Sequence, residues 1–470
     1  MPPPAVSAGT AGSATIAAIA TAVAPGQGSV AIVRLSGDDA EAIGRRLFQA
    51  PGQQVWDSHR VLYGHVVDPS SGERLDEALL LLMRAPRSFT RETVVELHCH
   101  GGMICVQRVL DAVLAAGARR ALPGEFSQRA FLNGRLDLTR AEAISELITA
   151  RSRRAAQLAL AGLDGGLQER INGLRERLLD QLAELEARVD FEDDLPPLDG
   201  PAVARELAAV RRALEQLVAE ADQGLLLREG LRVAIVGRPN VGKSSLLNRL
   251  SRSERAIVTD QPGTTRDLVE SELVLEGVPL TLLDTAGIRS TDDPVEQIGI
   301  ERSRAALQGA DAVLLLFDLT AGWTAADEAL EALVPAGVPL LRVGNKADQR
   351  PPGSTTAAEQ TVEQTVEPAD VCISALRGDG QPQLVAALLE RCGRCGDQGL
   401  QVALNRRQRD LAAAAATSLG ASLEAASADL PWDFWTIDLR AAVRSLGEIT
   451  GAEVSEAVLD RVFSRFCIGK

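Results

Sequence analysis

The stretch Gly237-Arg-Pro-Asn-Val-Gly-Lys-Ser244 decides the fold of the central part of this chain. It follows the apolar run Arg232–Val236 and precedes the helical pattern Ser245–Leu250, so it has the strand–loop–helix context of a G-x-x-x-x-G-K-S phosphate-binding loop. Glycines let backbone N–H groups approach phosphates, and the N-terminus of the following helix favours negative charge. We expect Lys243 to bridge β- and γ-phosphate oxygens and the Ser244 hydroxyl to ligate Mg²⁺.

A second motif, Asp284-Thr-Ala-Gly287, follows the apolar run Leu280–Leu283. Its carboxylate, Asp284, is expected to hold the Mg²⁺ through water, and the amide of Gly287 to sense the γ-phosphate. The order along the chain is that of a nucleoside-triphosphate-binding domain.

The third motif, Asn345-Lys-Ala-Asp348, points to the base. The carboxylate of Asp348 can accept two N–H bonds from guanine, whereas adenine would leave it unpaired. Ser374-Ala-Leu376 follows another apolar run and fits the loop that closes over the base. The sequence therefore predicts a GTP-binding domain that uses Mg²⁺. The predicted GTP-binding residues are Asn240, Val241, Gly242, Lys243, Ser244, Ser245, Thr259, Asp260, Gln261, Pro262, Gly263, Thr264, Thr265, Asp284, Thr285, Ala286, Gly287, Asn345, Lys346, Ala347, Asp348, Ser374, Ala375 and Leu376.

The hydrolytic device differs from that of Ras-like proteins, because Ile288 stands where a glutamine would orient the attacking water. Asn240 is an oxygen donor close to the phosphates, and the segment 259–267 offers hydroxyls and carbonyls that could enclose a monovalent cation. Thr265 could reach Mg²⁺, and Glu296 could orient water. Residue chemistry alone leaves each assignment open, since these residue types are common in ordinary loops.

Composition limits the remaining functions. The chain has 470 residues with a net charge of −15, so a polyanion such as RNA would need a local basic patch or a partner protein. Six cysteines are too few for a disulfide framework and indicate a reducing compartment, the cytoplasm. No apolar run is long enough to cross a bilayer, so no membrane partner is expected.

The texture of the sequence predicts several domains. Residues 1–14 are expected to be a disordered tail, and 15–135 a mixed α/β (α+β) domain of short apolar runs and helices. Long helical periodicity predicts an all-α domain in two parts, 136–229 and 394–470. Between them, 230–393 alternates strand and helix and predicts an inserted Ras-like α/β P-loop domain.

Two motifs, one at Cys467 and one at His98-Cys99-His100, allow more than one interpretation. Cys467 is a candidate reactive thiol, the alternative being a small buried cysteine on a terminal helix. His98 and His100 share one face of a predicted strand, but no second ligand pair follows, so strand packing is favoured over a metal site.

The wording of three regions resembles one family. Gly237–Asn248 resembles bacterial GTPases of the Era, Der and MnmE group, and the ending Phe466-Cys-Ile-Gly-Lys470 resembles MnmE (TrmE) within that group. The segments Val33–Gly37, Glu96–Gly102 and Pro123–Asn133 are similar to the folate-binding domain of the MnmE family. The resemblance extends from about Thr15 to Lys470.

The resemblance implies a potassium-activated GTPase that acts on tRNA. A K⁺ ion held by Asn240, Thr259, Gln261 and Thr264 would take the place of an arginine finger. Mg²⁺ would be held by Ser244 and Thr265, and Glu296 would orient the hydrolytic water. The family forms a homodimer through its N-terminal domains, and GTP with potassium brings the two G domains together.

The resemblance also implies the chemistry on tRNA. A 5,10-methylene- or 5-formyl-tetrahydrofolate would be contacted by Arg34, Glu96, Arg135 and Lys470. Family members often carry Lys in place of Arg135, which keeps the charge but changes its geometry. With Cys467 and the flavoprotein MnmG in a heterotetramer, the family adds (carboxymethyl)aminomethyl groups to C5 of the wobble uridine. The alternative is a ribosome-assembly GTPase of the Era or Der type, although this chain has one G domain and shows no GxxG-bearing RNA-binding domain.

Overall fold

The computed structural model describes residues 14–24, 26, 28–191, 198–253, 270–284, 307–349, 369–393, 404–428 and 430–469. Of the predicted tail 1–14, only Ala14 lies among them. Internal contacts divide the chain into two compact units: Met1–Ser145 with Gly162–Arg211 and Ala414–Lys470, and Glu146–Ala161 with Arg212–Ala413. In the described residues, no helix combines the length and apolar character that a membrane span requires.

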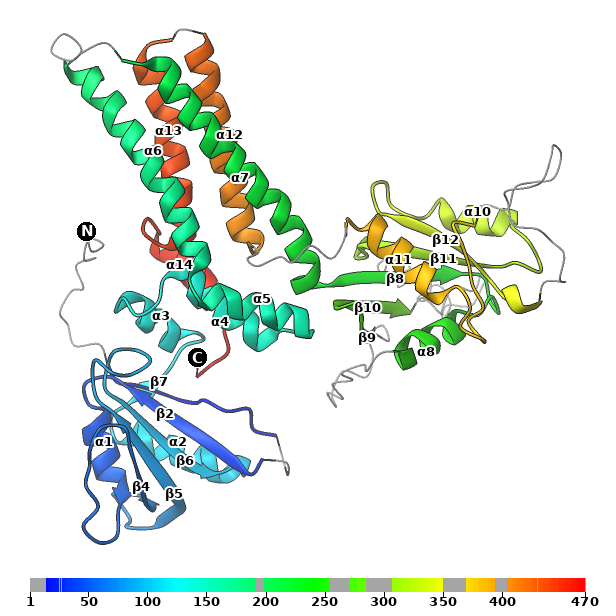
Figure 1. The fold of residues 1–470 in the computed structure, drawn as a ribbon. Helices are drawn as coiled ribbons and strands as arrows, with labels where there is room; N and C mark the ends of the chain where they lie inside the picture. The colour runs from blue at the N-terminus through cyan, green and yellow to red at the C-terminus, as the bar shows by residue number, and fades with distance from the viewer. Residues whose placement is uncertain are drawn as a thin grey trace, which may run out of the picture. The chain divides into compact units, whose positions relative to one another are not determined.

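The first unit begins with a mixed sheet, drawn in blue and cyan in Figure 1. Its described strands are, in sheet order, β3 (Phe48–Gln49), β4 (Arg60–Val67), β5 (Arg74–Met83), β6 (Val94–His100), β2 (Val30–Ser36), β1 (Ile16–Ile19) and β7 (Arg119–Arg120). All neighbours are antiparallel except β1 and β7.

One face of this sheet forms the core of the N-terminal region. Alternate residues of β2, Ala31, Val33 and Leu35, are buried in one cluster with residues of α1 (Ala40–Leu47) and α2 (Met103–Ala115). On the opposite face, α3 (Glu125–Leu132) contributes Phe126 to a small cluster with Ile16 and Ala18 of β1. The period-two burial confirms that these apolar runs are strands with one buried face.

Long helices complete the first unit. Its helices α6 (Gly166–Phe191) and α13 (Trp432–Thr450) lie side by side (Figure 1). Side-chain contacts join neighbouring helices of this bundle: Arg177 of α6 to Glu206 of α7 (Gly200–Glu229), and Ser422 of α12 (Arg406–Ser427) to the backbone of α13. The terminal helix α14 (Glu456–Phe463) packs against α3.

The start of the helical part predicted over 136–229 is divided into three helices, α4 (Leu138–Thr149), α5 (Arg153–Leu163) and α6. The Ser152 hydroxyl accepts a bond from the Ala155 amide at 3.1 Å, which starts α5. Gly165 has φ +89°, a left-handed conformation that separates the end of α5 from the start of α6.

The second unit contains a doubly wound sheet. Its described strands are, in sheet order, β13 (Val371–Cys372), β12 (Leu340–Asn345), β11 (Ala312–Asp318), β8 (Leu231–Gly237), β10 (Val278–Asp284) and β9 (Glu270–Leu275). All are parallel except the β9–β10 hairpin. The described helical segments around it are α8 (Lys243–Ser253), α10 (Ala325–Glu331), the 3₁₀ turn η2 (Ala347–Gln349) and α11 (Gln381–Arg391).

Both faces of this sheet are buried, as parallel sheets require. Val233 and Ile235 of β8 belong to one core cluster, whereas Ala234 and Val236 belong to the cluster on the opposite face. The first cluster also contains Leu158 of α5. Arg151 pairs with Glu272 of β9 at 3.0 Å, so the segment around α5 is part of this core region.

Candidate functional site

The phosphate loop lies at the carboxyl end of the central strand of the second unit. β8 ends at Gly237 and α8 begins at Lys243, and β8 pairs in parallel with β11 and β10 on its two sides. Ligands of open α/β sheets bind at this edge. Asn240 has φ +63°, and Ser244 is exposed in the first turn of α8.

The ammonium group of Lys243 lies inside this loop. Its Nζ donates to the carbonyl oxygens of Gly237 at 2.6 Å and Arg238 at 3.0 Å. These two carbonyls accept hydrogen bonds from the ammonium group, and phosphate oxygens would replace them when a nucleotide binds. This is the arrangement expected of a phosphate-loop lysine.

Asn345 joins three of the predicted motifs. Its side chain is only 2% exposed; Nδ2 donates to the carbonyl oxygen of Val241 at 2.7 Å, and Oδ1 accepts from the amide of Ala375 at 2.9 Å. Gly242 has φ +101°, and a methyl group there would overlap Asn345 Nδ2. The phosphate loop and the predicted base loop are therefore in contact through one buried amide.

A short hydrogen bond orders the base motif. The Ser374 hydroxyl donates to Asp348 Oδ1 at 2.6 Å and accepts from the amide of Arg377 at 3.1 Å. Leu376 is 75% exposed. The serine thus orients the carboxylate that would accept the guanine N–H groups.

Lys346, the second residue of the motif, pairs with the end of β11. Its Nζ lies 2.6 Å from Asp318 Oδ2. Burial alone would raise the pKa of Asp318, but hydrogen bonds from Lys346 and Thr320 lower it to about 2. Asp318 therefore stays ionised and holds Lys346 at physiological pH. Sequence reasoning missed this partner, because no motif marks it.

A second contact that the sequence did not reveal fixes the start of the phosphate loop. Arg238 Nε donates to Asp327 Oδ1 at 2.8 Å, and Asp327 Oδ2 accepts from the backbone and hydroxyl of Thr324 at the start of α10. The Asp327 side chain is fully buried. The arginine therefore links the loop to the cap of α10.

Much of the predicted hydrolytic and metal machinery lies outside the described residues. The side chain of Asp284 is also outside them, although its backbone pairs with Ile235 at the end of β10. The predicted residues outside are Thr259, Asp260, Gln261, Pro262, Gly263, Thr264, Thr265, Thr285, Ala286, Gly287, Glu296 and Lys470. Within the described part, no group of three or more His, Cys, Asp or Glu side chains is placed to hold a metal ion.

Two of the predicted folate residues, Arg34 and Glu96, lie together in the first unit. Arg34 of β2 and Glu96 of β6 are cross-strand neighbours, with Arg34 Nε 2.7 Å from Glu96 Oε1. The other oxygen of Glu96 lies 3.2 Å from His98 Nε2. Burial alone would raise the pKa of Glu96, but His98 and Arg34 lower it, so this buried carboxylate stays ionised. His98 thus has a carboxylate partner on its own strand.

Two aromatic rings connect the arginines of this site. The Arg34 guanidinium lies 5.8 Å from the centre of the Phe126 ring, and that of Arg135 lies 5.9 Å from the Phe89 ring. Phe89 packs on the small cluster that contains Phe126. Sequence reasoning did not find either ring.

The C-terminal tail lies against this site. Arg34 Nη1 donates to the carbonyl oxygen of Gly469 at 3.0 Å, and the amide of Gly124 lies 3.4 Å from the carbonyl oxygen of Cys467. Cys467 is exposed, whereas Phe466 is buried. The buried-cysteine alternative for Cys467 is therefore wrong.

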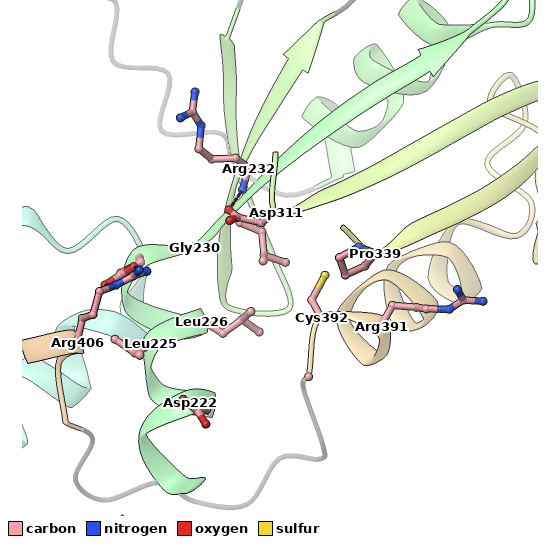
Figure 2. Close-up of a pocket in the computed structure, with 13 residues that line it drawn as sticks. Asp222, Leu225, Leu226, Gly230, Arg232, Asp311, Pro339, Arg391, Cys392 and Arg406 are labelled. Atoms are coloured by element: carbon pink, nitrogen blue, oxygen red, sulfur yellow. Dashed lines mark hydrogen bonds and ion pairs between the residues drawn. The ribbon is translucent and has the colours of Figure 1, made fainter. Parts of the chain in front are cut away.

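A cavity of about 660 Å³ lies elsewhere in the second unit (Figure 2). Its wall includes Leu231, Asp311 and Pro339, at or just before the amino ends of three parallel strands, so it is not at the nucleotide motifs. Burial raises the pKa of its Cys392 thiol to about 11, which keeps the sulfur protonated near neutral pH. We assign no function to this cavity.

Comparison with known families decides the relationship of the chain. The family model of the MnmE helical domain matches residues 138–467, and that of the GTP-binding protein TrmE N-terminus matches residues 15–135. The chain belongs to the MnmE family. A relative in Synechococcus sp. (strain RCC307), named tRNA modification GTPase MnmE, is 69% identical over 457 residues, which cover 97% of this chain and 98% of the relative.

Other similarities differ in strength. The protein of the same name in Prochlorococcus marinus (strain MIT 9303) is 67% identical to this MnmE-family chain over 458 residues, covering 97% of this chain and 98% of that one. A crystal structure of Aquifex aeolicus Era bound to GDP·AlF₄⁻ is 27% identical, covers 40% of this chain and 66% of that chain, and has a TM-score of 0.28. The last similarity is too low to carry an argument about function.

Proposed function

We propose that the chain is a potassium-activated GTPase of tRNA modification that acts, with the flavoprotein MnmG, on C5 of the wobble uridine. The observation that carries the proposal is the membership of the MnmE family over nearly the whole chain, whose relatives bear the name tRNA modification GTPase. The Era or Der type of ribosome-assembly function is less favoured for the same reason. We propose the cytoplasm as its compartment.

In the nucleotide site, the chain's own residues would bind and orient GTP. Lys243 would exchange the carbonyls of Gly237 and Arg238 for phosphate oxygens, and Asp348, oriented by Ser374, would accept two guanine N–H groups. Ser244 and Thr265 would hold Mg²⁺, which neutralises phosphate charge when bound. The exposed position of Ser244 at the start of α8 fits this role.

Potassium would be held by Asn240, Thr259, Gln261 and Thr264, and Glu296 would orient the attacking water. The left-handed conformation of Asn240 is the support within the described residues, because it turns the loop at the position proposed to bind the ion. Amide and hydroxyl oxygens are suitable ligands for a hard monovalent cation.

A tetrahydrofolate would be held by Arg34, Glu96, Arg135 and Lys470, and it supplies a one-carbon unit when bound. The donor set fits a pterin. Glu96 is an ionised, buried acceptor whose oxygens keep lone pairs beyond those used by Arg34 and His98. Arg34 and Arg135 would recognise a carbonyl or the glutamate tail, and the exposed Cys467 would act nearby.

We propose that the protein is a homodimer through its N-terminal region. The open face of the first sheet supports this, because β4 and β5 expose Val61 (59%), Tyr63 (47%) and Leu79 (42%) to solvent. A contiguous apolar surface of this kind marks a protein contact. Sedimentation of the protein with Tyr63→Glu and Leu79→Glu would give monomers, whereas an unchanged dimer would place the interface elsewhere.

The experiment that tests the function is mass spectrometry of tRNA nucleosides from a deletion strain. Complementation with the wild-type gene should restore the modified wobble uridine, and Cys467→Ser should not. Full modification in the deletion strain, or a purified protein without affinity for tetrahydrofolate, would contradict the proposal.

A further inference from the structure

Two glycines hold the C-terminal tail, and the first precedes α3. Gly124 has φ +68°, and a methyl group on it would overlap the carbonyl oxygen of Phe463. Its amide is directed to the carbonyl oxygen of Cys467, at 3.4 Å. Only glycine accommodates both this conformation and so close an approach of Phe463, the last residue of α14.

The second glycine lies in the tail itself. Gly469 has φ +93°, and a methyl group on it would lie 2.6 Å from the carbonyl oxygen of Ile19 and 2.9 Å from Cα of Ala20. Its own carbonyl oxygen accepts the bond from Arg34. The tail therefore lies directly on the backbone at the end of β1.

Between these two glycine contacts, the side chains of the tail differ in their burial. Phe466 is 6% exposed and packs against Phe463, at 5.2 Å between ring centres, whereas Ile468 is 60% exposed and Cys467 is exposed. The backbone is held on both sides of Cys467, so its thiol is presented to solvent two residues from the contact with Arg34.

We propose that Gly124 and Gly469 are positioning residues that hold the Cys467 thiol at the Arg34–Glu96 site. The inference rests on the proposed function, because it assigns the thiol a role in modification. Both glycines belong to the first unit, whereas the nucleotide motifs belong to the second. Their loss is therefore expected to reduce tRNA modification while GTP hydrolysis continues.

The first test is hydrogen–deuterium exchange of the C-terminal peptide in the full-length protein. Gly124→Ala and Gly469→Ala should each make this peptide exchange about tenfold faster or more, because the close backbone contacts that hold the tail are lost. Two left-handed glycines that lack close neighbours serve as matched controls. Gly72 (φ +74°) and Gly337 (φ +90°) have nothing within 4 Å of the added methyl group, so Gly72→Ala and Gly337→Ala should leave this peptide unchanged.

The second test measures the modified wobble uridine in a deletion strain that carries each variant. Gly469→Ala should lower its formation by about tenfold to a hundredfold, since misplacement of a reacting group by about 1 Å has effects of this size. GTP turnover and the melting temperature of Gly469→Ala should remain those of Gly337→Ala. If Gly124→Ala does not fold, Gly469→Ala alone decides, because it alters only the tail.

Slow exchange of the tail in Gly469→Ala would overturn the proposal, and so would full modification by that variant. Equal loss in Gly337→Ala would also overturn it, since strain alone would then be the cause. The proposed function fails in a distinguishable way: Cys467→Ser would then retain modification, while the exchange difference between Gly469→Ala and Gly337→Ala would persist.

Discussion

The side-chain amide of Asn345 donates a hydrogen bond to the carbonyl oxygen of Val241 at 2.7 Å, although 104 positions separate the two residues. Through this bond the first residue of the base-recognition motif holds the backbone of the phosphate loop. The same side chain accepts from Ala375, so binding of the base and binding of the phosphates are expected to be coupled.

Asn345→Ala should therefore weaken GTP binding and lower stability together. Loss of the amide leaves the Val241 carbonyl and the Ala375 amide without their partner, at a cost of about 1–3 kcal/mol for each buried group. Urea unfolding and nucleotide titration would measure both effects. Asn248→Ala, at an exposed position of α8, is the matched control and should change stability by less than about 0.5 kcal/mol. Normal GTP affinity in Asn345→Ala would contradict the coupling.

Asp348→Asn should change the base that the site prefers. Asparagine would present an N–H donor to the guanine donors, whereas the C2 carbonyl of xanthine could accept from it. GTP affinity should fall by about a hundredfold, in line with the loss of two charge-assisted bonds, and affinity for xanthosine triphosphate should rise. Parallel titrations with both nucleotides would measure the exchange. Unchanged preference for GTP would remove Asp348 from the base site.

Potassium should accelerate GTP hydrolysis relative to sodium at the same ionic strength. Asn240→Ala should abolish the difference, because it removes one proposed ligand of the ion. Phosphate release in the two salts, with wild type and Asn240→Ala side by side, measures it. Equal wild-type rates in both salts would refute the potassium proposal and leave the rest of the GTP site intact.

Arg238→Ala should destabilise the protein more than the loss of an exposed pair. It leaves the carboxylate of Asp327 buried without its cation, and such losses cost about 3–5 kcal/mol. Arg444→Ala breaks a pair whose arginine is 75% exposed, so it should cost less than about 1 kcal/mol. Thermal unfolding of the two variants compares the two environments. Equal melting temperatures would mean that Asp327 finds another partner.

Asp318 should make stability depend on acid pH. The pKa of this carboxyl is lowered from 3.8 to about 2 in the folded protein, so the folded state binds its proton less readily than the unfolded chain. The resulting stabilisation is fully present above about pH 4 and is lost as the pH falls toward 2. Urea unfolding across this range should show a weaker dependence for Asp318→Asn than for wild type. Asp433→Asn, at an exposed position, should behave as wild type.

Much of the fold could be predicted because its signals are local. The alternation Ala31, Val33, Leu35 is a strand pattern by itself, and the glycine, lysine and serine of the phosphate loop have fixed spacing. The division of the predicted helical part 136–229 was harder, because nothing local shows that the buried Gly165 adopts a left-handed conformation between α5 and α6.

The partners of the predicted residues could not be found in this way. Asp327 lies 89 positions from Arg238, and nothing in its neighbourhood marks it as more than a residue in the cap of α10. Phe126 belongs to a segment that the family resemblance had singled out, yet only packing brings its ring to Arg34. Such contacts depend on how distant elements meet, and local patterns carry no trace of that.

The membership of Leu158 in the core around β8 has a practical consequence for fragments of this protein. Leu158 is 2% exposed and packs in one cluster with Leu273 and Leu280 of the β9–β10 hairpin, and Leu227 at the end of α7 belongs to the same cluster. A recombinant piece cut at residues 230 and 393 would lack both leucines. Such a piece would expose apolar strand surface to solvent and be prone to aggregate. A soluble nucleotide-binding fragment therefore has to retain 146–161 and the end of α7.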